Sequence, residues 1–253
     1  MQRSSAMSSQ AFDRSVSPSE GWVRVGVLAG FLATFAMTVV LAAAYGLAAA
    51  LGKPDGWFFE RWLWALVHNP VAAHTADGVL LAIGVNLAVG LIFALIYARF
   101  FAERLTGPGW WNGMRFALIP WALSLLVFLP LMGGGFLGLA IGAGPLPIIG
   151  NLILHLVYGA TLGAIVALAV ADGLDDRPEE RDNATAAERG AAVGTAVGLI
   201  AGVVVGWLAG PALGGVDSRA ASAIGVALIL GAAGLAIGSF AGMERYEVSR
   251  QHR

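Results

Sequence analysis

Three histidines and one aspartate are the residues of this chain whose types could bind a metal ion. They are His68, His74, Asp77 and His155, and the expected path of the chain brings all four to one end of its helices. Neutral imidazoles with one carboxylate suit zinc or copper, and imidazole also binds haem iron. Their spacing differs from that of a metal site on one helix, because no two lie four residues apart and Pro70 separates the first two histidines.

The second interpretation of these histidines gives them ordinary hydrogen bonds at helix ends and at the membrane surface, with no cofactor. His155 is the most informative of the three, because it falls inside an apolar stretch. An ionisable group in the hydrocarbon layer is costly and usually faces protein or a cavity. Both interpretations therefore predict that His155 points into the protein rather than toward lipid.

The sequence offers no other catalytic pattern. It has no cysteine, which excludes disulfides, thiolate metal sites and thiol catalysis. No nucleophile elbow, His-Glu-x-x-His zinc motif or Walker A loop is present. Paired carboxylates occur only in the segment 172–189, whose composition predicts a solvated linker. We therefore expect a protein that is not an enzyme.

The composition is that of a membrane protein. Of the 253 residues, 58% are hydrophobic and only 12% are charged, whereas a soluble domain has roughly a quarter of its residues charged. A net charge of -1 gives no support to a nucleic-acid partner. The lipid bilayer is thus the first expected partner.

The stretches free of charged side chains predict the membrane spans. A helix needs about 20 apolar residues to cross the hydrocarbon core, and five stretches are long enough. The third is too long for one helix and is interrupted by glycines and prolines between 133 and 150, so we divide it into two spans joined by an uncharged connection. The five stretches are 25–52, 78–98, 116–171, 190–216 and 220–243. The prediction is an all-α, polytopic integral membrane protein with six transmembrane helices.

The basic residues predict the orientation of these helices. Lys and Arg collect in the cytoplasmic loops of membrane proteins, and with the N-terminus inside, only Lys53, Arg61 and Arg219 remain outside. The other twelve are Arg3, Arg14, Arg24, Arg99, Arg104, Arg115, Arg177, Arg181, Arg189, Arg245, Arg250 and Arg253. Both termini are therefore expected in the cytoplasm, in the inner membrane of a prokaryote.

The same pattern divides the chain into regions. A polar cytoplasmic tail is expected at 1–20, a four-helix transmembrane module at 21–171, an acidic cytoplasmic linker at 172–189, a transmembrane hairpin at 190–243 and a second tail at 244–253. The aromatic-rich segment 56–69 predicts a short interfacial helix on the outer face. Asn69 then caps a helix whose first residue is Pro70.

Small residues at every fourth position are the strongest internal pattern. Helices in a bilayer associate through close backbone approach, which rows of small side chains permit. These rows predict tight packing within the chain, or else self-association and docking on a larger membrane complex, for which the fifth and sixth helices are the best candidates. The longest rows are Gly26, Gly30, Thr34, Thr38, Ala42, Gly46 and Ala50 in the first helix, and Gly190, Gly194, Gly198, Gly202, Gly206 and Gly210 in the fifth.

Two of these segments resemble a known group of sequences. The run from Gly30 to Thr38 and the run His155-Leu-Val-Tyr158-Gly159-Ala-Thr-Leu-Gly163 are similar to uncharacterised multi-pass membrane proteins of bacteria and archaea. That group has a Gly/Thr/Met-rich first helix and a His-x-x-Tyr-Gly-x-x-x-Gly helix. The resemblance covers residues 21–171, implies the four-helix module and implies no activity.

Three functions are compatible with the sequence. The first is a non-catalytic structural or accessory subunit of a membrane assembly. The second is a membrane protein that binds a metal or haem on its outer face through the histidines. The third is a passive channel or small-molecule permease, for which the connection between 133 and 150 would re-enter the membrane and line a pore.

Overall fold

The computed structural model describes residues 22–102, 104–173, 178–213, 222–235 and 237–238, and these residues form helices and turns without a strand. The α-helices are α1 (Trp22–Leu51), α2 (Phe58–Val67), α3 (Pro70–Asp77), α4 (Val79–Ile96), α5 (Gly109–Leu123), α6 (Leu129–Leu131), α7 (Leu146–Gly173) and α8 (Pro178–Leu213). Two π-helical turns, η1 (Tyr97–Phe101) and η2 (Ser124–Phe128), prolong α4 and α5, and η3 (Phe136–Ile141) is a 3-10 helix. A last helix covers Ser222–Leu235. Both expected tails lie outside the described residues.

Four helical segments are long and apolar enough to cross a membrane, which confirms an all-α membrane protein. They are Trp22–Leu51, Val79–Phe101, Gly109–Leu131 and Leu146–Ala169, and they match the first four predicted spans. The apolar parts of the two later helices are shorter, at Ala196–Ala212 and Ser222–Leu235. Large apolar side chains are exposed along these helices, as lipid contact requires.

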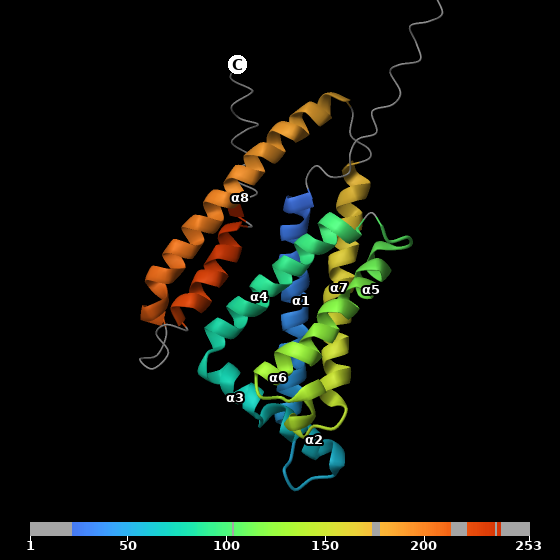
Figure 1. Ribbon diagram of the computed structural model, residues 1–253, viewed down its shortest axis with the longest axis vertical. Helices are drawn as coiled ribbons and strands as arrows, with labels where there is room; N and C mark the ends of the chain where they lie inside the picture. Colours follow the sequence, from blue (N-terminus) through green and yellow to red (C-terminus); the bar gives the residue numbers. More distant parts are fainter. Residues whose placement is uncertain (1–21, 103, 174–177, 214–221, 236, 239–253) are drawn as a thin grey trace, which may run out of the picture.

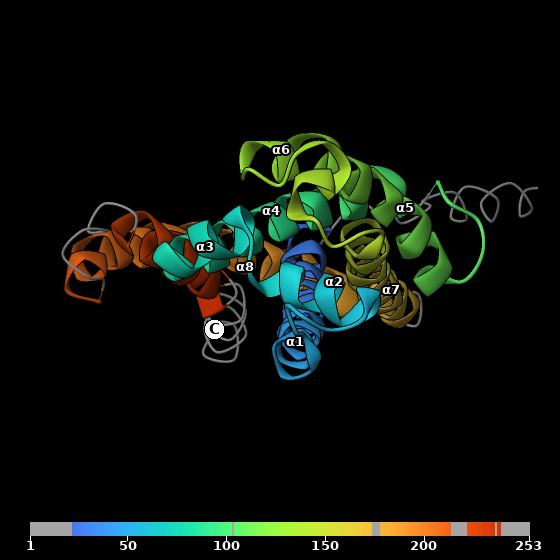
Figure 2. The same cartoon turned by 90° about the horizontal axis from the view of Figure 1, so that it is seen from below.

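The helices are arranged as a bundle with a hairpin beside it. Figure 1 shows α1 and α7 along the long axis, with α4 slanting across α1. The α8 helix, in orange, and the Ser222–Leu235 helix, in red, form a pair at one edge. The view from below in Figure 2 places this pair on the far side from α5 and α7. At the lower end of Figure 1, α2 lies near the end of α1, and α3 lies at the foot of α4.

Glycines on α1 bring it against α4, as the small-residue row predicted. A Cβ added at Gly26 would lie 3.1 Å from a methyl carbon of Leu95, and one added at Gly30 would contact Ala94 and Leu91. Thr34 continues this row and lies against Gly90. Farther along α1, a Cβ at Gly46 would meet nothing within 4 Å among the residues that the structure describes.

The α5 and α7 helices approach each other through glycines, and here the structure corrects the predicted start of the third span. The helix begins at Gly109 rather than at residue 116. Gly109 and Gly113 face Gly163 and Gly159 on α7, with the two backbones in direct contact. The search for charge-free stretches stopped at Arg115 and so missed the α5 half of this interface.

The core of the bundle is filled by large side chains that meet between α1, α4, α5 and α7. Tyr97, Leu162 and Phe116 are at most 2% exposed. The ring centroids of Tyr97 and Phe116 lie 5.1 Å apart. Aromatic and aliphatic packing of this kind excludes water from this part of the bundle.

The glycine row of the fifth predicted helix packs inside the chain. On α8, Gly198 meets Gly234, Gly202 meets Leu230, and Gly206 meets Ala227 of the last helix. The last helix in turn reaches the bundle, where a Cβ at Gly84 of α4 would lie 2.6 Å from the carbonyl oxygen of Gly225. The hairpin is therefore attached to α4 through small residues.

Three predicted boundaries differ in the structure. The interfacial helix expected at 56–69 is α2, which ends at Val67. Asn69 accepts a hydrogen bond from the Ala72 N–H with Pro70 at the start of α3, as predicted, but this helix stops before Gly78 instead of continuing into the span. In the segment 172–189, expected as a linker, the backbone is helical from Pro178, a residue suited to the first position of a helix.

The connection between 133 and 150 is folded against α2 and α3. Gly133 and Gly134 contact Pro70 and Val71 of α3, and Gly144 lies against the indole of Trp62 on α2. Glycine adopts a positive φ at no steric cost. The glycines with positive φ in this segment are Gly133, Gly135, Gly138, Gly142 and Gly144. The connection thus packs on α2 and α3, and its re-entry into the membrane stays a prediction.

Candidate functional site

Each of the three predicted histidines makes the same hydrogen bond within its own helix region. The Nδ1 atoms of His68, His74 and His155 lie 3.0, 2.6 and 2.8 Å from the carbonyl oxygens of residues Trp64, Pro70 and Asn151, four positions earlier. A carbonyl oxygen only accepts, so Nδ1 carries the hydrogen in all three. The neutral ring then has a lone pair on Nε2, which is free for a ligand.

The three rings have different surroundings. The hydrogen bonds of His68, just after α2, and of His74, on α3, are both exposed. The ring of His68 also stacks on Trp64, with centroids 4.3 Å apart. His155 is only 9% exposed, which confirms that it points into the protein.

A metal centre is not assembled from these residues in the structure. Among the residues it describes, no three His, Asp or Glu side chains are grouped so as to hold a metal ion. The side chain of Asp77 lies outside that description. The zinc, copper or haem site therefore stays a prediction, and the geometry that can be analysed is that around His155.

A broken helix lies opposite His155. Pro120 lies inside α5, and the helix turns into the π-helical η2 at Ser124. The Ser124 hydroxyl oxygen accepts a 2.6 Å hydrogen bond from Asn151 Nδ2, the residue whose carbonyl accepts from His155. Single π-helical turns inside α-helices are frequent at functional sites. The part of the α5–α7 interface around Ser124 and Asn151 is therefore a candidate functional site.

A second polar group joins α1, α4 and α7 in the middle of the bundle. The Tyr158 hydroxyl donates a 2.6 Å hydrogen bond to the carbonyl oxygen of Gly90. The side chain of Asn86 donates to the Thr38 hydroxyl at 3.3 Å, and that hydroxyl donates to the Thr34 carbonyl oxygen at 2.8 Å. Side chains on three helices are thus linked by hydrogen bonds within the apolar layer.

Sequence reasoning did not assign a role to Ser124 or to the Tyr158 hydroxyl. Tyr158 shares a helix face with His155 because it follows three residues later, and this signal was available in the sequence. The hydrogen-bond partner of Tyr158 could not be predicted from the sequence, because Gly90 is 68 residues away. For Ser124, Pro120 four residues earlier was the only local sign of a helix irregularity.

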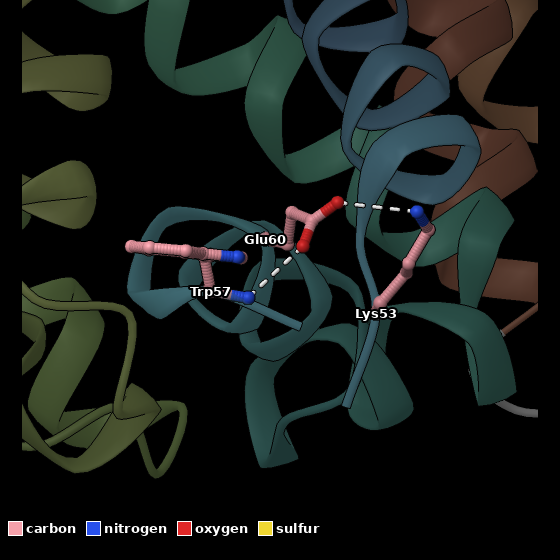
Figure 3. Close-up of polar contacts among 3 residues, drawn as sticks. All are labelled: Lys53, Trp57 and Glu60. Carbon is pink, nitrogen blue, oxygen red and sulfur yellow. Dashed lines mark hydrogen bonds and ion pairs between the residues drawn. The ribbon is translucent and has the colours of Figure 1, made fainter. Parts of the chain in front are cut away.

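A carboxylate, Glu60, stabilises the start of α2. As Figure 3 shows, Glu60 accepts a 2.9 Å hydrogen bond from the Trp57 backbone N–H and pairs with Lys53 Nζ at 3.2 Å. This arrangement satisfies a free N–H group at the helix start. The hydrogen bond from Trp57 and then the contact with Lys53 lower the pKa of Glu60 below its usual 4.5.

Acid should break the contacts that Glu60 makes at the start of α2. Because the folded-state pKa of Glu60 is lowered, its contacts stabilise α2 fully above pH 4.5 and are lost as the pH falls below that value. We expect the backbone amide resonance of Trp57 to shift in nuclear magnetic resonance spectra with a midpoint below pH 4.5, and Glu60→Gln to abolish this shift. A midpoint at or above 4.5 would contradict the arrangement. Lys53→Met serves as control, since it should raise the midpoint only in part.

Comparisons of the chain with protein-family models, with curated proteins and with solved structures found no match.

Proposed function

We propose that this protein is a non-catalytic integral membrane protein of the prokaryotic inner membrane, acting as a structural or accessory subunit of a membrane assembly. It crosses the membrane six times with both termini in the cytoplasm. Four of the six spans are the long apolar helices, and α8 with the Ser222–Leu235 helix supplies the other two. The small-residue contacts of these two helices with each other and with α4 support this count.

The observation that carries the proposal is the closed packing of the four-helix bundle. The buried polar or charged residues in the described part of the chain are Thr34, Asn112, His155 and Ser222. None is a carboxylate or a permanently charged base of the kind that lines ion pathways. Aromatic filling of the core and backbone contact at the glycines favour a scaffold over a passive permease.

We propose that the partner binds to the hairpin formed by α8 and the Ser222–Leu235 helix. Its glycine row faces inward, and its other face carries large apolar side chains. Among the most exposed of these on α8 are Val193 at 65%, Val197 at 61%, Ile200 at 64% and Leu208 at 73%. A second copy or another membrane subunit would pack on this face.

Native mass spectrometry after extraction in lipid nanodiscs tests this function. We expect a stoichiometric assembly heavier than the 26.1 kDa chain, reduced by Ile200→Ala. Truncating one anchor residue of an interface typically weakens it by a factor of about 10 or more. Ile153→Ala is the matched control, because Ile153 is 50% exposed on α7 and should leave the assembly intact. A chain that runs as a monomer, or an assembly equally sensitive to both changes, would refute the proposal.

A further inference from the structure

Exposed arginines gather at the end of the bundle where α1 begins, η1 ends and α5 begins. Arg99 lies on η1, Arg104 in the turn after it and Arg115 on α5, and all three are exposed. The sequence that joins the first of them to the last holds one carboxylate, that of Glu103. Among the residues that the structure describes, none of the three arginines forms an ion pair, whereas Lys53, beyond the opposite end of α1, has one. This end of the bundle therefore carries a net positive charge.

Arg99 and Arg115 lie at about the same height along the bundle. The ring of Phe116, the residue after Arg115, lies against the rings of Tyr97 and Phe101, with centroid distances of 5.1 and 5.0 Å. Arg99 is the middle residue between these two aromatic residues of η1. The two arginines therefore mark one level of the bundle, on two different helices.

Arg115 lies within an apolar surface of α5. It belongs to the span Gly109–Leu131, and residues three or four positions away on a helix share its face. Trp111, one turn before it, and Leu118 and Ile119, one turn after it, are all exposed. An arginine in hydrocarbon is costly, so its side chain extends to the headgroups. Helical side chains tilt toward the start of the helix, and four residues of helix span about 6 Å, so the guanidinium group reaches the level of Trp111.

Aromatic rings orient Arg99 at this level. Its guanidinium carbon lies 6.0 Å from the ring centroid of Trp22 on α1 and 5.5 Å from that of Phe100. At such distances the face of the ring attracts a cation, and tryptophan rings favour the headgroup level of a membrane. Because Arg99 itself stays exposed, its N–H groups are available to an anion there.

The ligand that fits these surroundings is a phosphate that carries acyl chains. A guanidinium group binds two phosphate oxygens through parallel N–H groups. A lipid would also lay its acyl chains on Leu118 and Ile119 beside Arg115, whereas a soluble phosphate would leave these side chains without a contact. A lipid with an ammonium group would bring a second positive charge close to the arginines, which is unfavourable. A lipid with a net negative charge is therefore favoured.

We propose that Arg99 and Arg115 each bind the phosphate group of an anionic phospholipid such as phosphatidylglycerol. Trp22 and Trp111 lie beside the two headgroups, and the acyl chains follow the exposed apolar side chains of the spans. This inference rests on the membrane location given in the proposed function, but it does not depend on assembly with a partner.

The test uses the full chain in a non-ionic detergent, with dioleoyl phosphatidylglycerol or dioleoyl phosphatidylethanolamine added. Native mass spectrometry counts the lipids bound to the monomer, so a failure to assemble with a partner does not affect the result. We expect phosphatidylglycerol to bind more tightly than phosphatidylethanolamine. Arg99→Gln and Arg115→Gln should each weaken the binding of one phosphatidylglycerol molecule about tenfold, because each removes a charge-assisted contact.

Matched variants separate these sites from a general effect of charge. Arg61 is an exposed arginine on α2, so Arg61→Gln removes the same charge elsewhere and should bind phosphatidylglycerol like the unaltered chain. Arg115→Lys keeps the charge without the planar pair of donors, so it should weaken binding to a smaller extent. This variant keeps the test decisive if Arg115→Gln fails to fold.

Three results would overturn the proposal. The first is equal affinity for the two lipids, and the second is the same affinity for phosphatidylglycerol in the Arg61, Arg99 and Arg115 variants. The third is displacement of phosphatidylglycerol by glycerol 1-phosphate, its soluble headgroup analogue, which would assign the arginines to a soluble phosphate instead.

Discussion

Replacing Gly113 by valine should force α5 away from α7 and lower the melting temperature of the purified protein. A Cβ at this position would lie 2.8 Å from the Gly163 nitrogen and would collide with the Gly159 carbonyl oxygen. Both obstacles are backbone atoms, which cannot move aside as a flexible side chain would. Overpacking of this kind typically costs about 1–3 kcal/mol, which corresponds to about 2–12 °C in a chain of this size.

The matched control for this prediction is Gly150→Val on α7, where an added Cβ meets nothing within 4 Å. We expect its melting temperature to equal or exceed that of the unaltered chain, because glycine is a poor helix former. Thermal unfolding in one detergent, followed by tryptophan fluorescence, compares the two variants. Equal melting temperatures for both would show that α5 and α7 do not approach through these glycines.

Cysteine labelling should give an all-or-none result for the number of spans. The chain has no cysteine, so each introduced thiol is the only one that a maleimide can modify. In spheroplasts, a membrane-impermeant maleimide should label Asp55→Cys, in the turn before α2. It should label Thr106→Cys, in the turn before α5, only after the membrane is broken. The physical basis is the distribution of arginines between the two sides.

The deciding variant is Ser218→Cys, within the sequence between α8 and the last helix. If α8 and the last helix both cross the membrane, this thiol reacts in intact spheroplasts to the same extent as Asp55→Cys. A thiol that reacts only after permeabilisation, like Thr106→Cys, would leave four spans. The Asp55 and Thr106 variants thus calibrate the two possible outcomes in the same experiment.

The sequence alone located the four helices that are long and apolar enough to cross a membrane. The stretch 25–52 became α1, Trp22–Leu51, and the stretch 78–98 became Val79–Phe101. This success has a local cause, because a chain in hydrocarbon must satisfy each backbone N–H and C=O within its own helix. Asn69 as the cap of a helix that starts with Pro70 was predictable for the same reason, since a capping hydrogen bond spans three residues.

Only the tertiary structure decided which helices meet and what lies between them. The break before Gly78, the contact of Gly113 with Gly159 and the hydrogen bond from Tyr158 to Gly90 all depend on how helices cross. Rows of small residues occur on most helices of this chain, so periodicity cannot select the partner of each row. The histidines show the same limit: each Nδ1 hydrogen bond joins residues four apart and is local, whereas the burial of His155 depends on the helices packed against α7.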